Sequence, residues 1–255
     1  MQDSVYNSVF GALTQKYRLD IIANNLANAS TIGYKKDKLS FEDVLIHYAH
    51  DFNDPNLGIT GGVRWPEKDL NTQPRIGEKQ IDFSQGDLRR TQNPLDLAIG
   101  GHGFFKLQTP SGIMYTRAGN FTLDKDGFIV SPDGYKLLGK GGPIQIAGRG
   151  KITITEDGVV YSGNTQVGII DIVDFQNKDL VKKFGQNLYK SDPNNEKPVN
   201  NPTIYQGYLE GSNVQVVKEM VKMIDTLRNF EAMQKVMTNT NDQDRNVINK
   251  VGNPT

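Results

Sequence analysis

The chain has 255 residues, enough for one large domain or two small ones with a sizeable core. Its 29 basic and 29 acidic residues cancel to a formal net charge of zero, which gives no support to nucleic-acid or membrane-surface binding by long-range attraction. The lack of cysteine excludes disulfides and thiol chemistry. We find no apolar run of about 18 residues and no signal-peptide pattern, so we expect neither membrane insertion nor a cleaved leader.

The N-terminal segment has the periodicity of an amphipathic helix. Apolar residues recur at steps of three and four, as one face of a helix requires, at Tyr6, Phe10, Leu13, Tyr17 and Ile21. The pattern predicts a helix over residues 3–28. A turn-like stretch follows, in which Gly33 suits a left-handed backbone conformation.

Three asparagines near the end of this helix are unusual, because an asparagine amide competes with the backbone and favours caps and turns. They are Asn24, Asn25 and Asn28. The aliphatic Ile21 and Ile22 precede them, and Leu26 lies between them. One interpretation is simple helix ending. The other is that their amides bond to neighbouring subunits and fix the register between them, while the aliphatic residues supply burial.

The region after the helix changes composition. Residues 51–75 contain Pro55, Pro66, Pro74 and a Gly61-Gly62 pair, and they show neither helical nor alternating periodicity. We therefore expect an extended connector over residues 46–78.

Residues 79–209 have the signature of an all-β domain. Short apolar runs, such as 121–123 and 128–130, are separated by turn signals. These signals are Asp126-Gly127, Pro132-Asp133-Gly134, Asp157-Gly158 and Gly163-Asn164. The spacing predicts a series of hairpins.

The C-terminal region, 210–255, predicts a second and longer helix. Its N-cap is expected at Ser212 or Asn213, with Glu219 favourable in an early turn. The apolar stripe has a mean spacing below 3.6 residues, which favours supercoiling against another helix. The stripe comprises Val217, Met220, Ile224, Leu227, Phe230, Met233 and Met237.

Two amphipathic helices at opposite ends of the chain need a partner, because a lone helix is marginal in water. The expected fold is α+β: a discontinuous coiled-coil domain of the terminal helices, from 1–45 and 210–255, a connector over 46–78 and an all-β domain over 79–209. Both stripes are expected to meet within the chain and then between subunits. The alternative is an ordinary α+β domain whose helices cover a sheet.

No motif supports catalysis. The three histidines, His47, His50 and His102, lack the spacing of a metal site. The glycine-rich stretch 100–105 lacks the ending and helix of a phosphate loop, and Asp124 to Gly127 lacks the later ligands of a calcium loop. Turns account for both stretches. We expect no catalytic, cofactor or metal site and no small-molecule substrate.

Three blocks of sequence carry a specific resemblance. The first is IIANNLANASTIGYK at 21–35, and the second runs from QGDLRRTQNPLDLAIGGHGFFKL at 85–107 to YTRAGNFTLDKDGFIVSPDGYKLLG at 115–139. The third is LEGSNVQVVKEMVKMIDTLRNFE at 209–231. In this order they closely resemble the bacterial flagellar rod and hook family, over most of the chain outside 45–78 and 175–205.

The resemblance implies a structural axial subunit with no catalytic activity. Members of the family pass unfolded through the flagellar type III export apparatus, then assemble with copies of themselves and adjacent rod proteins. Their terminal helices form an inner coiled-coil tube, around the export channel, and their β-rich domains form an outer layer. The implied location is the basal-body rod, which crosses the periplasm and transmits torque for motility.

Chain size favours a rod subunit over a hook subunit. The stretches 1–6 and 10–13 depart from the usual opening of distal rod proteins, which favours the proximal rod. A distal-rod or other axial subunit stays the alternative. The competitor from another class is a secreted fibre or adhesin-like module that binds a ligand through its β region.

Overall fold

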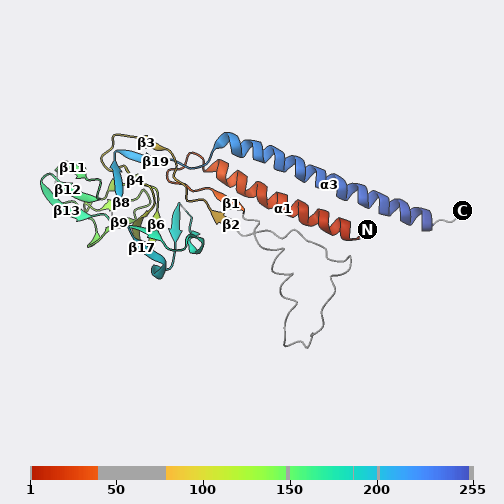
Figure 1. The fold of residues 1–255 in the computed structure, drawn as a ribbon, viewed down its shortest axis with the longest axis horizontal. Coiled ribbons are helices and arrows are strands. Elements are labelled where there is room, and N and C mark those ends of the chain that lie inside the picture. Colours follow the sequence, from red (N-terminus) through yellow and green to blue (C-terminus); the bar gives the residue numbers. More distant parts are fainter. Residues whose placement is uncertain (1, 40–78, 148–149, 186, 200–201, 253–255) are drawn as a thin grey trace, which may run out of the picture. The chain divides into compact units, whose positions relative to one another are not determined.

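The structure is a computed structural model that describes residues 2–39, 79–147, 150–185, 187–199 and 202–252 (Figure 1). The expected connector at 46–78 lies outside these residues, as do His47 and His50. The chain divides into two compact units. The helical unit comprises Met1–Leu26, Asp37–Gln80 and Val216–Thr255, and the β unit comprises Ala27–Lys36 and Ile81–Gln215.

The helical unit contains both terminal helices, as the periodicity predicts. They are α1, Gln2–Ala27, and α3, Val216–Gly252. The chain runs in opposite directions along the two helices, which lie side by side in Figure 1. The short strands β1, Asp37–Leu39, and β2, Lys79–Ile81, pair with each other.

The ends of the helices confirm one expectation and correct another. After α1 the Thr31 N–H donates to the Asn28 carbonyl at 3.1 Å, and Gly33 takes the predicted left-handed conformation with φ of 68°. The expected N-cap of the C-terminal helix is wrong, because α3 begins only at Val216. The Ser212 hydroxyl accepts from the Val214 N–H at 3.2 Å, and Asn213 is engaged elsewhere in the β unit.

The β unit is built from short, mostly antiparallel strands, and its largest sheet has the path β15-β16-β6-β5-β9-β8-β7. Strand β10 adds to β9, β14 adds to β5, and β17 adds to β14. The members of this sheet are β5 (Phe104–Thr109), β6 (Gly112–Thr116), β7 (Thr122–Leu123), β8 (Ile129–Val130), β9 (Lys136–Gly139), β10 (Gly142–Pro143), β14 (Ile172–Phe175), β15 (Lys182–Lys183), β16 (Leu188–Lys190) and β17 (Glu196–Pro198).

Three smaller sheets complete the β unit. They are β11-β12-β13, β18-β4 and β19-β3. Short 3₁₀ turns occur at Lys178–Leu180 and Pro193–Asn195. The strands are β3 (Leu88–Arg90), β4 (Leu97–Gly100), β11 (Ile152–Ile154), β12 (Val159–Ser162), β13 (Thr165–Ile169), β18 (Thr203–Gln206) and β19 (Tyr208–Glu210).

The predicted hairpins are confirmed. Strands β7 and β8 pair across Asp126-Gly127, with Leu123 opposite Ile129. Gly127 has φ of 81° and Gly158, between β11 and β12, has φ of 83°, so both take the left-handed conformation that favours glycine in tight turns. The glycine-rich stretch before Phe104 is likewise a turn that leads into β5.

The core of the β unit has an aliphatic part and an aromatic part. The aliphatic part gathers side chains such as Leu97, Leu107 and Ile129 from several sheets. In the aromatic part Phe104 contacts Phe175 and Tyr189, with ring centroids 5.0 and 5.5 Å apart. Such a core gives the β unit the means to fold around its own interior.

Candidate assembly interface

One face of α3 is less exposed than the rest of that helix. Its members follow alternating spacings of four and three residues, the repeat that keeps one face against a partner helix. They are Glu219, Met223, Thr226, Phe230, Met233, Met237 and Thr240. Methionine is flexible and fills irregular gaps, so this face can adapt to the surface it packs on.

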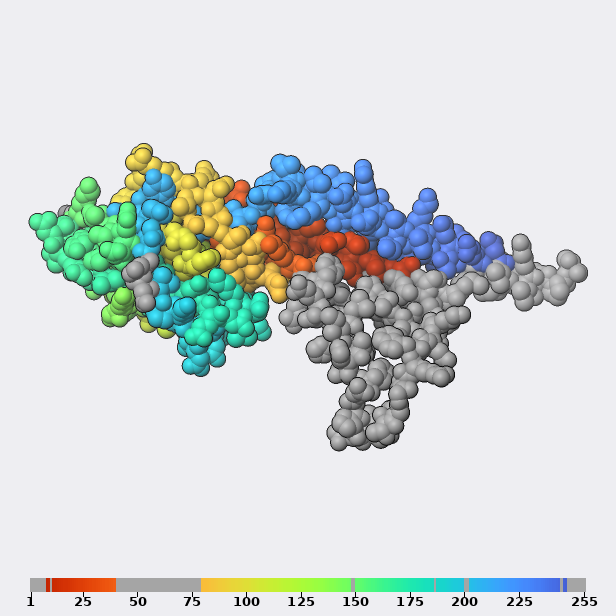
Figure 2. Space-filling model, in the orientation of Figure 1, coloured from red at the N-terminus to blue at the C-terminus, as the bar shows by residue number. Residues whose placement is uncertain are grey.

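The matching face of α1 begins with small residues. Ser8 and Ala12 are buried, and Gly11 lies so near α3 that a Cβ on it would be 3.4 Å from Sδ of Met233. Small side chains on one helix and a long one on the other allow close approach. Figure 2 shows the atoms of α3 along those of α1.

A second, apolar face of α3 is exposed. This face is apolar only along the first turns of the helix. Further along, it carries the polar residues Glu231, Lys235 and Thr238. We call it the apolar stripe, and its residues are between 40% and 75% exposed. The stripe consists of Val217, Met220, Val221, Ile224 and Leu227.

The apolar stripe changes the expected packing of α3. Val217, Met220, Ile224 and Leu227 were expected to meet the first helix within the chain, but they face outward. The face that is less exposed runs through Phe230 and the neighbouring heptad positions instead. A role for the outward residues in assembly between subunits stays a prediction.

The residues predicted to form one apolar face of α1 also differ in exposure. Ile21 is buried and Tyr17 is half-buried, whereas Leu13 is exposed together with Val9. The side chains of Tyr6 and Phe10 lie outside the described residues. Their contribution to an interface therefore stays a prediction.

The three asparagines have different surroundings. Asn25 is buried, and its amide forms two hydrogen bonds with one residue: Nδ2 donates to the carbonyl of Asp37 and Oδ1 accepts from the N–H of Asp37, both at 2.9 Å. Asn28 accepts from the hydroxyl of Thr31 at 3.3 Å, and Asn24 is exposed. Asn25 thus has an intramolecular role at the edge of β1. The expected hydrogen bonds of the asparagines to other subunits stay a prediction. The expected burial of Leu26, which is half-buried in this structure, between subunits stays a prediction too.

The residues that follow α1 and precede α3 meet in the β unit, and we call this region the junction, residues 31–36, 81–86 and 210–214. Asn213 holds it together: its Oδ1 accepts from the Lys36 N–H at 2.8 Å, and its Nδ2 donates to the carbonyls of Asp82 and Ser84 at 2.8 and 3.1 Å. The sequence offered Asn213 only as a helix cap. No short-range pattern reveals bonds to residues so distant in the chain.

A buried charge cluster joins the junction to Arg117, which follows β6, and we call Lys35, Arg117 and Glu210 the polar lock. Lys35 Nζ lies 2.5 Å from Oε1 of Glu210, and Arg117 Nη1 lies 3.1 Å from Oε2. The side chains of Lys35 and Glu210 are both 0% exposed. Burial lowers the pKa of Lys35 from its ordinary value, although Glu210 pulls in the opposite direction, and burial likewise lowers the pKa of Arg117.

A second polar cluster lies on the largest sheet. Lys106 Nζ is 2.8 Å from Oε2 of Glu196 and 3.3 Å from Oδ2 of Asp171, and the Tyr115 hydroxyl donates to Glu196. Burial works against the charged form of Lys106, but Glu196 and Asp171 outweigh it and raise its pKa above 10.5. Burial and the bond to Glu196 also raise the pKa of Tyr115, so its phenol stays protonated as a donor. Cross-strand bonding of this kind ties β5, β6 and β17 together.

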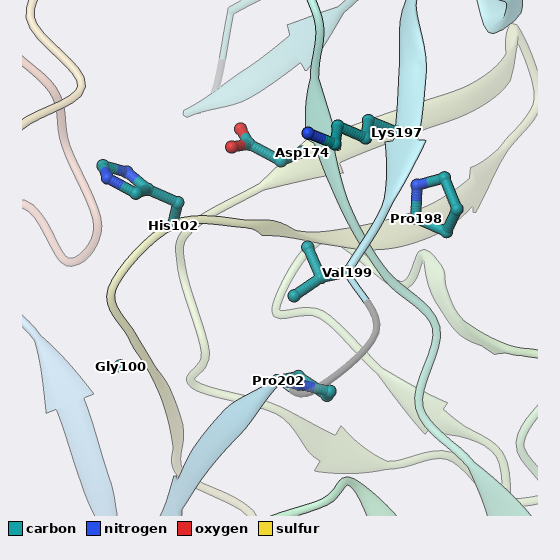
Figure 3. A pocket seen from close by; sticks show the side chains of 7 residues that line it. All are labelled: Gly100, His102, Asp174, Lys197, Pro198, Val199 and Pro202. Carbon is teal, nitrogen blue, oxygen red and sulfur yellow. The ribbon is translucent and has the colours of Figure 1, made fainter.

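A shallow pocket of about 370 Å³ lies in the β unit (Figure 3). Its polar lining side chains are His102, Asp174 and Lys197, and none of the lining residues is a serine, threonine or cysteine that could act as a nucleophile. Asp174 has a partner in Lys178 at 3.8 Å. In the described part of the chain no group of three or more histidine or acidic side chains could hold a metal ion, and neither described helix is apolar and long enough to span a membrane.

Family models match three separate parts of the chain. Residues 6–35 match the flagella basal body rod protein model, and residues 98–162 match the flagellar hook protein FlgE/F/G D1 domain. Residues 205–250 match the C-terminal region of the flagellar basal body rod FlgEFG proteins. The matched parts include most of α1, much of the β unit and most of α3.

Whole-chain relatives agree with these models. The flagellar basal-body rod protein FlgF of Caulobacter vibrioides is 35% identical over 255 residues, covering 99% of each chain. FlgG of Bacillus subtilis is 34% identical over 98% of this chain and 99% of its own, and FlgF of Mesorhizobium japonicum is 31% identical over 99% of each. The chain therefore belongs to the family of flagellar basal-body rod proteins.

Proposed function

We propose that this protein is a structural subunit of the flagellar rod that polymerises through its terminal helices. The observation that carries the proposal is the apolar stripe on α3. Its five apolar side chains stay exposed, although another face of the same helix is less exposed. Apolar area of this kind gains stability only when another surface covers it. Neighbouring subunits of the same rod are the occupants that suit it.

The packing in the polymer is then a coiled coil with two kinds of contact. The heptad-spaced face of α3 packs on α1 within the chain, and the apolar stripe packs on helices of neighbouring subunits. Exposed Val9 and Leu13 of α1 supply apolar area for the same neighbours. The β unit, with its own core, forms the outer layer.

The rod context determines the rest of the proposal. The subunit reaches the basal body through the flagellar type III export apparatus without a cleaved signal peptide, and it lies in the rod across the periplasm. It transmits torque and surrounds the export channel. It binds copies of itself and adjacent rod proteins, and it has no catalytic activity, cofactor, metal or nucleic-acid ligand.

We place the subunit in the proximal rod, because the full-length similarity to two FlgF proteins and the departures at 1–6 and 10–13 favour it. The distal rod is the second candidate, since FlgG proteins are 34% identical over nearly the whole chain. A secreted adhesin would require ligand binding by the β unit, and its shallow pocket offers little to select a ligand.

The test is to place the subunit in purified basal bodies. A strain that lacks the gene receives the full-length protein with a short epitope in an exposed turn, such as the one at Gly163-Asn164. We expect restored swimming and antibody label on the rod close to the membrane ring. Label at the hook-proximal end would assign the subunit to the distal rod. The rod function itself would be contradicted if the strain that lacks the gene swam without the protein, or if the label lay outside the basal body.

A further inference from the structure

The polar lock occupies a special position in the β unit. Lys35 belongs to the segment that follows α1, and Glu210 lies at the end of β19, on the segment that leads to α3. Arg117 follows β6 of the largest sheet. The lock therefore joins both helix-bearing segments to the sheet at one point.

Glu210 is the centre of the lock, because its carboxylate contacts three other segments. Oε1 accepts from Lys35 Nζ at 2.5 Å and from the Gly86 N–H at 2.9 Å, and Oε2 accepts from Arg117 Nη1 at 3.1 Å. Lys35 also donates to the carbonyl of Ser84 at 2.7 Å. Each of the three charged side chains is thus held in its orientation by more than one hydrogen bond.

The cations are further restrained from the side of the sheet. Arg117 Nη2 donates to the carbonyl of Gly101 at 2.5 Å, and its guanidinium lies 5.3 Å from the ring centre of Phe104. The Lys183 ammonium donates to the carbonyl of Lys35 at 2.5 Å. These contacts hold Arg117 and the backbone of Lys35 in place from a second direction.

Stability does not explain the lock. It places two cations against one carboxylate, and among the described residues Nε of Arg117 is buried without a hydrogen-bond partner. Removing charges from water is costly, and apolar side chains of similar volume often give an equally stable protein. The arrangement of Lys35 is therefore better explained by the geometry that it imposes than by the free energy that it supplies.

We propose that Lys35, Arg117 and Glu210 act as a positioning lock that fixes the two helix-bearing segments to the β unit, so that twisting force on the helices passes to the sheet. The inference rests on the proposed rod function, which supplies the force. Its local part, restraint of the junction, is independent of any rod.

The experiment compares Lys35→Met with the matched control Lys36→Met in the full chain. Lys36 is the next residue, but its side chain is 21% exposed, and its ammonium lies 3.5 Å from Oδ2 of Asp82, which is 14% exposed. Hydrogen exchange is measured at Gly33 and Asn213, whose N–H groups donate to the carbonyls of Glu210 and Tyr34. Thermal unfolding and swimming in a viscous medium are measured in parallel.

We expect Lys35→Met to unfold within about 2 °C of the parent protein or above it. Glu210 keeps Arg117 and the Gly86 N–H as partners, the Ser84 carbonyl keeps Asn213, and the cost of burying the ammonium is removed. Exchange at the two amides should become about tenfold faster, since the junction opens locally without global unfolding. Swimming speed should fall with viscosity more steeply than in the parent, and Lys36→Met should change none of the three.

Several outcomes would overturn the lock. One is parental exchange and parental swimming in Lys35→Met, and another is a midpoint lowered by more than about 8 °C, which would make Lys35 an ordinary stabilising residue. Glu210→Gln removes the carboxylate that both buried cations contact and must lower the midpoint; if it does not, the charges are uncoupled. If the parent protein itself fails to restore swimming, the rod function fails, while the exchange data still decide the lock.

Discussion

The most direct test of the assembly interface is a charge in the apolar stripe, Ile224→Asp. In the isolated chain Ile224 is 51% exposed, so an aspartate there remains in water and costs only a few tenths of a kcal/mol of helix propensity. The matched control is Asn229→Asp, which adds the same charge to an exposed position on the other side of α3. Both variants should fold, with thermal midpoints near that of the parent.

Assembly separates the two variants. Burying the exposed half of an isoleucine contributes about 1 kcal/mol, which the variant loses. An unpaired carboxylate enclosed by apolar side chains costs about 3–5 kcal/mol more. The sum of at least about 4 kcal/mol weakens each contact about a thousandfold.

The assay uses a strain that lacks the gene and receives either variant. Incorporation is measured by immunoblot of purified basal bodies, and function by the swimming radius in soft agar. We expect no incorporation and no swimming for Ile224→Asp, and parental values for Asn229→Asp. If Ile224→Asp assembled as well as the control, the apolar stripe would not be an interface between subunits.

Three further predictions concern the described contacts. Gly33→Ala should lower the stability of the β unit by about 2 kcal/mol or more, measured by urea unfolding, because φ is 68° and the new Cβ would lie 2.5 Å from Ala118 N. Asn25→Leu should lower the free energy of unfolding by about 2–4 kcal/mol, because it removes the two hydrogen bonds that the Asn25 amide forms with the N–H and the carbonyl of Asp37. An unchanged urea midpoint would contradict the intramolecular role of Asn25. The pKa of Lys35 in the folded protein lies below 10.5, its ordinary value, so between these two pKa values the unfolded chain binds more protons than the folded chain. The free energy of unfolding should therefore rise with pH over this range. Urea titrations of Lys35→Met over the same pH range should lack this rise.

Patterns over short stretches predicted much of the fold. The helices and hairpins were predictable because periodicity and turn residues act within a few positions, as at Gly127 and Gly158. The face of α3 was harder. Its sequence offers two overlapping apolar faces, and the stripe with the stronger hydrophobic residues is the exposed one, since the less exposed face includes Glu219 and Thr226. Apolar character alone does not distinguish a face packed within the chain from one packed between chains.

The junction could not be predicted from sequence, because its contacts join residues far apart. Lys35 and Glu210 are separated by 175 positions, and the bond between Lys36 and Asn213 spans 177. A lysine beside another lysine has the pattern of a solvated surface, and the burial of one of the two follows only from the packing of distant segments. Asn213 likewise has the local signature of a cap, and a tertiary contact uses its amide instead.

The sheet pairings of the β unit also determine when it can form. Strand β4 pairs with β18, and β3 pairs with β19, so residues 203–210 close sheets that begin near residue 88. Contacts between such distant segments require an entropically costly loop closure and slow down folding. A chain that is released with its N-terminus first cannot complete these pairings until residues 203–210 are present. These two sheets can therefore close only when the residues just before α3, which begins at Val216, are available.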